Sequence, residues 1–187
     1  MKKKEALFDL IKALTKNEKR FFKIYASRHA IRGKNNYVKL FEAIDSLKEY
    51  DEKKLSQKIR NESFFKHISG EKSHLYNLIL ECLNIYHMDS SIDRQINKYI
   101  NIARVLSDKQ LDEQSIRIVE KVKNLSNEYG RFENTIPIIT LLKKKGFDRD
   151  TITEEKMDMY YQELFSSLDK LKIKFEYNKI RDSLFLK

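Results

Sequence analysis

The chain contains few of the residues that interrupt helices or crosslink small folds. Its 187 residues include four glycines, one proline, one cysteine and no tryptophan. Because glycine and proline are the main helix breakers, their scarcity predicts long uninterrupted helices. The single cysteine, Cys82, excludes an intramolecular disulfide. It lies in an apolar run, which predicts a buried and unreactive thiol.

Long apolar runs are also missing. No stretch approaches the roughly 18 to 20 apolar residues needed to cross a bilayer. The basic start, residues 1–4, resembles that of a secretory signal, but Asp9, Lys12 and Lys16 interrupt the apolar segment that should follow. We therefore expect no membrane association and a cytoplasmic location, where a free thiol stays reduced.

Patterns typical of catalysis or cofactor binding are not found. Four scattered glycines cannot build a phosphate-binding loop. His67 and His74 are seven residues apart, with a helix break expected at residues 69–70, and His87 lies five residues after Cys82. Neither spacing matches a zinc site. We predict a non-enzymatic protein with no catalytic residues, cofactor or metal.

The chain is rich in aromatic residues and in residues that favour helices. Ten tyrosines and eleven phenylalanines supply large apolar surfaces, which a disordered chain would lack. Apolar residues recur at three- and four-residue spacing along most of the chain. Residues that favour helix N-termini precede four of these segments: Thr15, Asp51, Ser69 and Thr151. The most apolar segment, 69–86, is predicted to be a central helix with Leu78, Ile79 and Leu83 buried.

The second half of the chain has a different organisation. After a linker at residues 89–91, one helical hairpin of about 40 residues is expected to end at Gly130, and a longer one follows with a helix end at Gly146. Tandem hairpins favour an α-solenoid of the tetratricopeptide class. We therefore predict an all-α protein in which residues 1–89 form a compact helical domain and residues 90–187 form tetratricopeptide-like hairpins.

Three segments carry a resemblance to a known family. Residues 14–27, 36–44 and 75–80 resemble an uncharacterised family of tetratricopeptide-like proteins of Bacteroidota. The resemblance covers most of the first 130 residues. It implies a helical-repeat architecture, and it implies that this chain is a fragment or a short member, because members are longer. The family has no assigned catalytic residues, so the resemblance implies no site.

The positive charge is concentrated at the start of the chain. Residues 1–40 contain twelve lysines and arginines against three acidic residues, which accounts for +9 of the net charge of +10. The candidate polyanion-binding residues lie on one predicted helix and the loop after it: Lys16, Lys19, Arg20, Lys23, Arg28, Arg32 and Lys34. The alternative is a solvated lysine-rich face. A helix-turn-helix or winged-helix variant, with Phe64-Phe65 as a degenerate wing, is also possible on this pattern.

Two functions are consistent with these patterns. The first is a scaffold or adaptor whose helical-repeat groove binds another protein. The second is a nucleic-acid-binding regulator that contacts DNA or RNA through its basic head.

Overall fold

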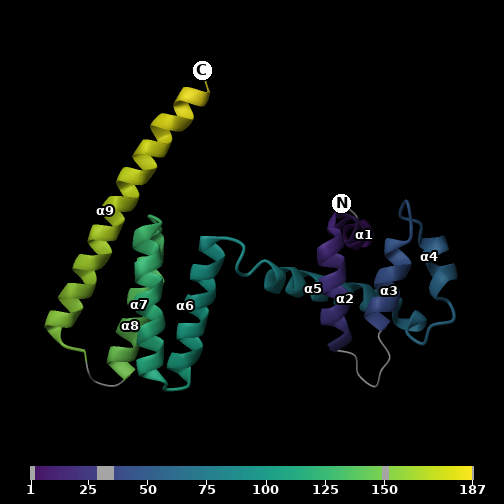
Figure 1. Ribbon diagram of the computed structural model, residues 1–187, viewed down its shortest axis with the longest axis horizontal. Coiled ribbons are helices and arrows are strands. Elements are labelled where there is room, and N and C mark those ends of the chain that lie inside the picture. The colour runs from purple at the N-terminus through teal and green to yellow at the C-terminus, as the bar shows by residue number, and fades with distance from the viewer. Residues whose placement is uncertain (1–2, 29–35, 149–151, 187) are drawn as a thin grey trace. The chain divides into compact units, whose positions relative to one another are not determined.

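The computed structural model describes residues 3–28, 36–148 and 152–186. All regular structure in these ranges is helical, which confirms the predicted all-α class (Figure 1). The chain divides into two compact units, residues 1–87 and residues 88–187, and each has its own hydrophobic core. In the described part of the chain, no helix is both long and apolar enough to cross a bilayer.

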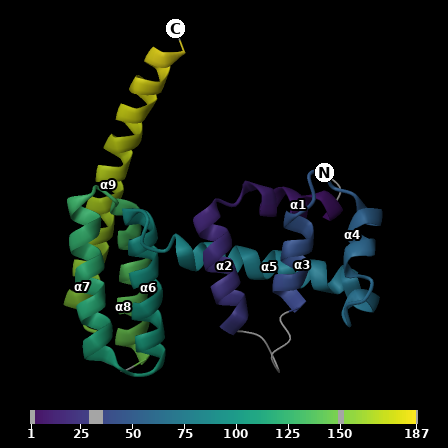
Figure 2. The same ribbon diagram turned by 45° about the vertical axis from the view of Figure 1, so that its right-hand side comes forward.

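The first unit is arranged around its last helix. Its elements in chain order are α1 (Lys3–Ala13), α2 (Lys16–Arg28), α3 (Asn36–Asp45), α4 (Glu52–Ile59), the 3-10 turn η2 (Phe65–His67) and α5 (Ile68–Tyr86). Helices α1, α2 and α3 all pack against α5, and Figure 2 shows α5 running across α2 and α3. In α5, Leu75, Ile79 and Cys82 are at most 2% exposed. The predicted core residues Leu78 and Leu83 are only partly buried, because they lie at the two edges of this apolar side.

Two helices of the first unit begin where the sequence predicts. The Glu18 amide donates to Thr15 Oγ1 at 3.3 Å, and the Glu18 carboxylate accepts from the Thr15 amide at 2.7 Å. Asp51 caps α4 by accepting from the amides of Lys53 and Lys54. Both caps satisfy amides that the first helical turn leaves unpaired, so these predictions are confirmed.

The start of α5 corrects three predictions: a cap at Ser69, a helix break at residues 69–70 and a wing at Phe64-Phe65. Ser69 is not a helix cap, because η2 leads directly into α5 and the Ile68 amide already donates to the carbonyl of Phe65. Gly70 lies inside α5 on an open surface, where an added Cβ would meet nothing within 4 Å. The degenerate wing expected at Phe64-Phe65 is also wrong, since this segment is helical and Phe64 is a core residue.

The second unit begins with a tightly packed helical hairpin. Its elements are α6 (Ile92–Asp108), α7 (Asp112–Glu128), the 3-10 turn η3 (Phe132–Asn134), α8 (Thr135–Asp148) and α9 (Glu154–Phe185). The core draws on the first two helices and on α8: Ile96, Ile100, Ala103, Val119, Val122 and Ile138. Ser115 Oγ donates to the carbonyl of Ala103 at 2.8 Å, which shows how closely α6 and α7 approach.

The helix ends of this hairpin share one turn geometry. After α7, Gly130 has a φ of 62°, and the Arg131 amide donates to the Ser126 carbonyl at 2.7 Å. This is the Schellman arrangement, so the predicted glycine cap is confirmed. After α6, Gln110 has a φ of 61°, and the Leu111 amide donates to the Leu106 carbonyl at 2.9 Å. A glutamine therefore occupies a left-handed position that glycine adopts without steric cost.

The last two helices differ from prediction at their facing ends. Gly146 does not end α8, which continues to Asp148. A Cβ at Gly146 would lie 3.1 Å from Ile152 Cβ, so glycine permits close packing here. The N-cap of α9 is Thr153, whose hydroxyl accepts from the Lys156 amide. The predicted cap, Thr151, lies outside the described residues.

Replacing Gln110 with glycine should stabilise the second unit by about 1 kcal/mol, because glycine relieves the left-handed backbone. Gly130→Ala is the matched control and should destabilise by about 1 to 2 kcal/mol, since it introduces a Cβ at the equivalent position. Urea denaturation followed by circular dichroism measures both changes. Unaltered midpoints for both variants would contradict the assigned backbone strain.

Candidate functional site

Two of the candidate cations of α2 form ion pairs with acidic residues of α3. Lys19 Nζ lies 2.7 Å from Asp45 Oδ1, and Lys23 Nζ lies 2.7 Å from Glu42 Oε1. Phe22 is 1% exposed and anchors α2 in the core, which places these two lysines along the side nearest α3. Their charges are locally neutralised, so they add little to a polyanion-binding surface.

Three other candidates remain on the open side of α2. Lys16, Arg20 and Arg28 are exposed, and with Ile24 they follow one another at four-residue spacing. Residues four apart are neighbours on a helix surface. We name this line of four residues the α2 ridge. The last two candidates, Arg32 and Lys34, lie outside the described residues.

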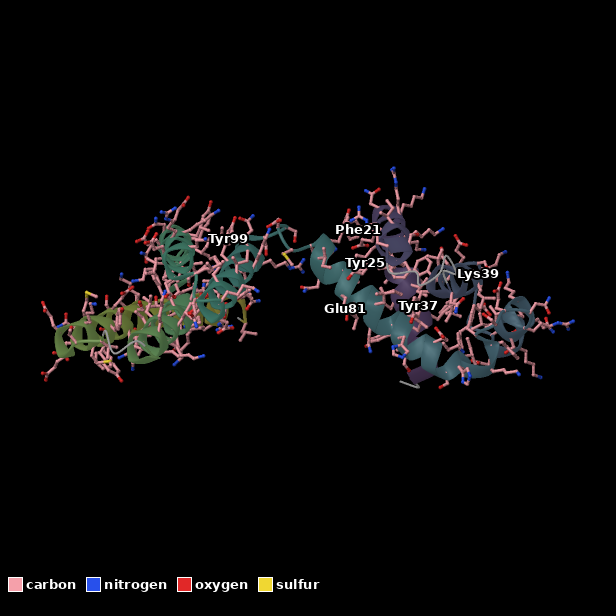
Figure 3. The ribbon with its side chains drawn as sticks, turned by 90° about the horizontal axis from the view of Figure 1, so that it is seen from below. Phe21, Tyr25, Tyr37, Lys39, Glu81 and Tyr99 are labelled. Carbon is pink, nitrogen blue, oxygen red and sulfur yellow. The ribbon has the colours of Figure 1, made fainter. Side chains whose placement is uncertain are left out.

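Aromatic and polar contacts hold α2 against the end of α5. The ring centroid of Phe21 is 5.1 Å from that of Tyr86 and 6.4 Å from that of Tyr25. Figure 3 shows Phe21 and Tyr25 on α2 where it adjoins α5. Beside them, His87 Nε2 lies 2.6 Å from Glu18 Oε1. The α2 ridge therefore lies on a helix fixed at its N-terminal end.

The single cysteine lies in the core of the first unit. Cys82 is 2% exposed, and burial raises the pKa of its thiol to about 11. The reactive thiolate is therefore scarce near neutral pH. Across the described residues, no three or more histidine, cysteine or acidic side chains are grouped so that they could hold a metal ion.

A pocket of about 680 Å³ lies between α1, α4 and α5, and its lining includes Ser69, Ser73 and Asn77. Lys72 also lines it, but its ammonium lies 2.7 Å from Glu52 Oε1. That charge is therefore already compensated. The lining offers polar contacts for a small molecule and no nucleophile paired with a base.

Helix α9 carries more exposed large apolar side chains than any other described helix. It projects well beyond α7 and α8 (Figure 1). Its apolar side chains with at least 40% of their surface exposed are Met159, Tyr161, Phe165, Leu168, Ile173, Phe175, Tyr177, Ile180, Leu184 and Phe185. At about 100° per residue these side chains cannot lie on one face.

Most of them fall into two stripes. The lateral stripe consists of Tyr161, Phe165, Leu168 and Phe175, which lie within an arc of about 80°. The rings of Tyr161 and Phe165 are stacked with centroids 6.1 Å apart. The distal stripe consists of Ile173, Tyr177, Ile180 and Leu184, within an arc of about 60° on another side of α9.

Charged residues border both stripes. An acidic row, Asp158, Asp169 and Glu176, lies between the lateral and distal stripes. A basic row, Lys170, Lys174 and Arg181, lies along the other edge of the distal stripe. At its start, the distal stripe lines an open groove of about 500 Å³ together with Tyr129 and Phe132.

No protein-family model matches the chain. No curated protein and no solved structure matches it significantly. The resemblance to tetratricopeptide-like proteins of Bacteroidota therefore stays a prediction, and function is inferred from the residues alone.

Sequence reasoning identified the last helix and missed the exposure of its apolar residues. Tyr161, Leu168, Phe175 and Leu184 belong to the pattern that predicts this helix, yet the structure places all four on the surface. A helical-wheel projection could have revealed this, because the apolar residues are distributed around the helix instead of forming one stripe.

Glu18→Gln should destabilise the first unit in a pH-dependent way. Hydrogen bonds from the Thr15 amide and from His87 lower the pKa of Glu18 in the folded chain. A carboxyl group whose pKa is lower when folded stabilises fully above its unfolded pKa of about 4.3, and this stabilisation is lost as the pH falls through the folded pKa. The variant should lose about 1 to 2 kcal/mol at neutral pH.

Chemical denaturation at neutral pH and at about pH 3, which lies below the ordinary pKa of glutamate, measures this effect. The difference between the variant and the wild type should shrink at the lower pH. Glu120→Gln, at an exposed position on α7, is the control for loss of a carboxylate. A penalty that is the same at both pH values would contradict the role of the Glu18 charge.

Proposed function

We propose that this chain is a non-enzymatic protein-binding module and that α9 carries its binding surface. The observation that carries the proposal is the lateral stripe, whose four large apolar side chains are between 43% and 65% exposed. Exposed Lys172 lies within the same arc, between Leu168 and Phe175, so the contiguous part of the stripe is Tyr161, Phe165 and Leu168. Contiguous apolar patches mark interaction sites, because covering them removes apolar surface from water. The consecutive hairpins α6–α7 and α8–α9 support a tetratricopeptide-like scaffold behind this surface.

The chemistry around the lateral stripe indicates the kind of partner. Asp158, Asp169 and Glu176 run along one edge of it, on the exposed surface of α9. An amphipathic helix could lay its apolar side on the stripe, with neighbouring contacts every three or four residues. Lysine or arginine at the edge of that helix would face the acidic row and fix its orientation.

Synthetic amphipathic helical peptides test this proposal directly. A peptide with leucines on one side and lysines along the flank should bind at least about tenfold more tightly than its glutamate-flanked counterpart, because like charges oppose docking. Fluorescence anisotropy with the full chain measures both affinities. Phe165→Ser combined with Leu168→Ser should abolish the preference by removing the apolar centre of the surface.

Val105→Ser combined with Ile116→Ser is the matched control, because both residues are exposed apolar side chains on α6 and α7. This variant should bind the lysine-flanked peptide as the wild type does. Equal binding of the two peptides, or binding that survives the Phe165 and Leu168 changes, would contradict the proposed surface.

Nucleic-acid binding by the α2 ridge is a second candidate function. It is favoured by three exposed cations, Lys16, Arg20 and Arg28, on a helix whose opposite side is held in the core. Such a row can contact successive phosphates without disturbing the fold. Lys19 and Lys23 add less to it, since each is paired with an acidic residue of α3.

A salt series with DNA and RNA distinguishes this candidate. Changing Lys16, Arg20 and Arg28 to glutamine should weaken binding to all sequences and reduce the slope of log affinity against log salt by up to about three units. The charge-matched control changes three exposed lysines of the second unit to glutamine: Lys109, Lys144 and Lys179. Absence of wild-type binding at low salt would exclude the candidate, because attraction to phosphates is strongest there.

A further inference from the structure

The distal stripe has the spacing of a coiled-coil seam. Ile173, Tyr177, Ile180 and Leu184 are separated by four, three and four residues, and each is between 62% and 70% exposed. This alternation is the a/d pattern by which two helices pack side by side. In that frame, Ile173 and Ile180 occupy d positions and the other two occupy a positions.

The charged residues beside the seam have opposite signs on its two sides. Asp169 and Glu176 occupy g positions, whereas Lys174 and Arg181 occupy e positions. In a parallel pair of identical helices, each g residue faces the e residue five positions later in the other helix. Glu176 would then face Arg181 of the second copy, and Asp169 would face Lys174 of the second copy.

The opposite orientation brings like charges together. In an antiparallel pair, g residues face g residues and e residues face e residues. Glu176 and Asp169 would then approach acidic groups, and Lys174 and Arg181 would approach basic ones. The charge pattern is therefore complementary to itself in the parallel arrangement alone.

The two basic residues differ in how free they are. Lys174 Nζ already donates to the carbonyl of Gly130 at 2.9 Å, which holds it against its own chain. Arg181 pairs with the neighbouring Asp182 on the same helix, and its side chain is 55% exposed. Glu176 with Arg181 of the second copy is therefore the stronger of the two expected pairs.

The distal stripe is also accessible to a second copy. The side chains of Arg181 and Ser183 make their hydrogen bonds to residues of α9 itself. The seam begins after Lys170, whose Nζ lies 5.2 Å from the ring centroid of Phe132. It spans about two heptads, which is shorter than a standard interface requires for tight association.

We propose that the distal stripe binds a second copy of this chain, forming a parallel two-stranded coiled coil through residues 173–184. This inference rests on the proposed role of α9 as an interaction surface and names a partner for its second side. The pair is held by the four apolar residues of each stripe and is oriented by Glu176 and Arg181. Its small area predicts a concentration-dependent dimer of moderate affinity.

Analytical ultracentrifugation of the full chain tests the dimer, from about 1 µM to about 500 µM, the range of weak interfaces. The wild type should shift from monomer to dimer across the series. Ile180→Asn combined with Leu184→Asn should raise the dissociation constant at least about tenfold by removing half of the seam. Phe165→Ser combined with Leu168→Ser, on the lateral stripe, should leave it unchanged.

Charge exchange tests the orientation. Glu176→Arg and Arg181→Glu should each weaken the dimer severalfold, and the double variant should restore it, because the pair is re-formed with its signs reversed. In an antiparallel dimer Glu176→Arg would not weaken association through this pair, and the double variant would show no rescue. Circular dichroism verifies that each variant keeps its helices.

The outcomes separate the two proposals. A chain that stays monomeric throughout the series, or a dimer that survives the Ile180 and Leu184 changes, overturns the coiled coil. Peptide binding at the lateral stripe would still support the proposed function in that case. A dimer that responds to the variants as expected, with no peptide binding, supports the coiled coil and contradicts the proposed binding of a helical partner at the lateral stripe.

Discussion

The difference in length between α8 and α9 is the constraint on which the surface of the second unit depends. Helix α9 has 32 residues and its hairpin partner α8 has 14. Helix α9 is therefore about 48 Å long, whereas α8 is about 21 Å long and can cover less than half of it. Apolar side chains can leave water only where another element faces them. Along the first half of α9, α8 covers one side and buries Ser167, and η3 lies beside Lys170 and Lys174 in the middle of the helix. Tyr161, Phe165 and Leu168 lie on a side that α8 does not cover and stay exposed. Tyr177, Ile180 and Leu184 follow with the same kind of apolar pattern and remain exposed.

The first unit shows the reverse situation, in which packing removes a surface that the sequence suggests. Phe22 and Ala26 are buried, and this fixes the rotation of α2 about its axis. The rotation places Lys19 and Lys23 beside Asp45 and Glu42 of α3. Two of the five basic side chains of α2 are therefore paired with acidic residues of α3. The other three lie on the α2 ridge.

Several helix ends that depend on neighbours in sequence could be predicted, whereas the role of Gly146 and the exposure of α9 depend on neighbours in space and could not. Thr15, Asp51 and Gly130 act through residues within one turn, so a local pattern identifies them. Gly146 looks like a helix end, but its role is set by Ile152 across a close contact. The exposure of α9 escaped prediction for the same reason, because hydropathy identifies an apolar residue and does not show whether another helix reaches it.

Hydrogen exchange along α9 tests most directly whether its end is uncovered within one chain. Backbone amides exchange faster in segments that are weakly packed, because such segments open more often. Packing against a second copy must therefore slow amide exchange in the covered segment. We predict that residues 172–186 exchange faster than residues 154–171 in dilute solution, and that they slow by about tenfold or more as the concentration rises. Slow exchange of residues 172–186 at every concentration would mean that the chain covers this helix by itself, and it would contradict the account.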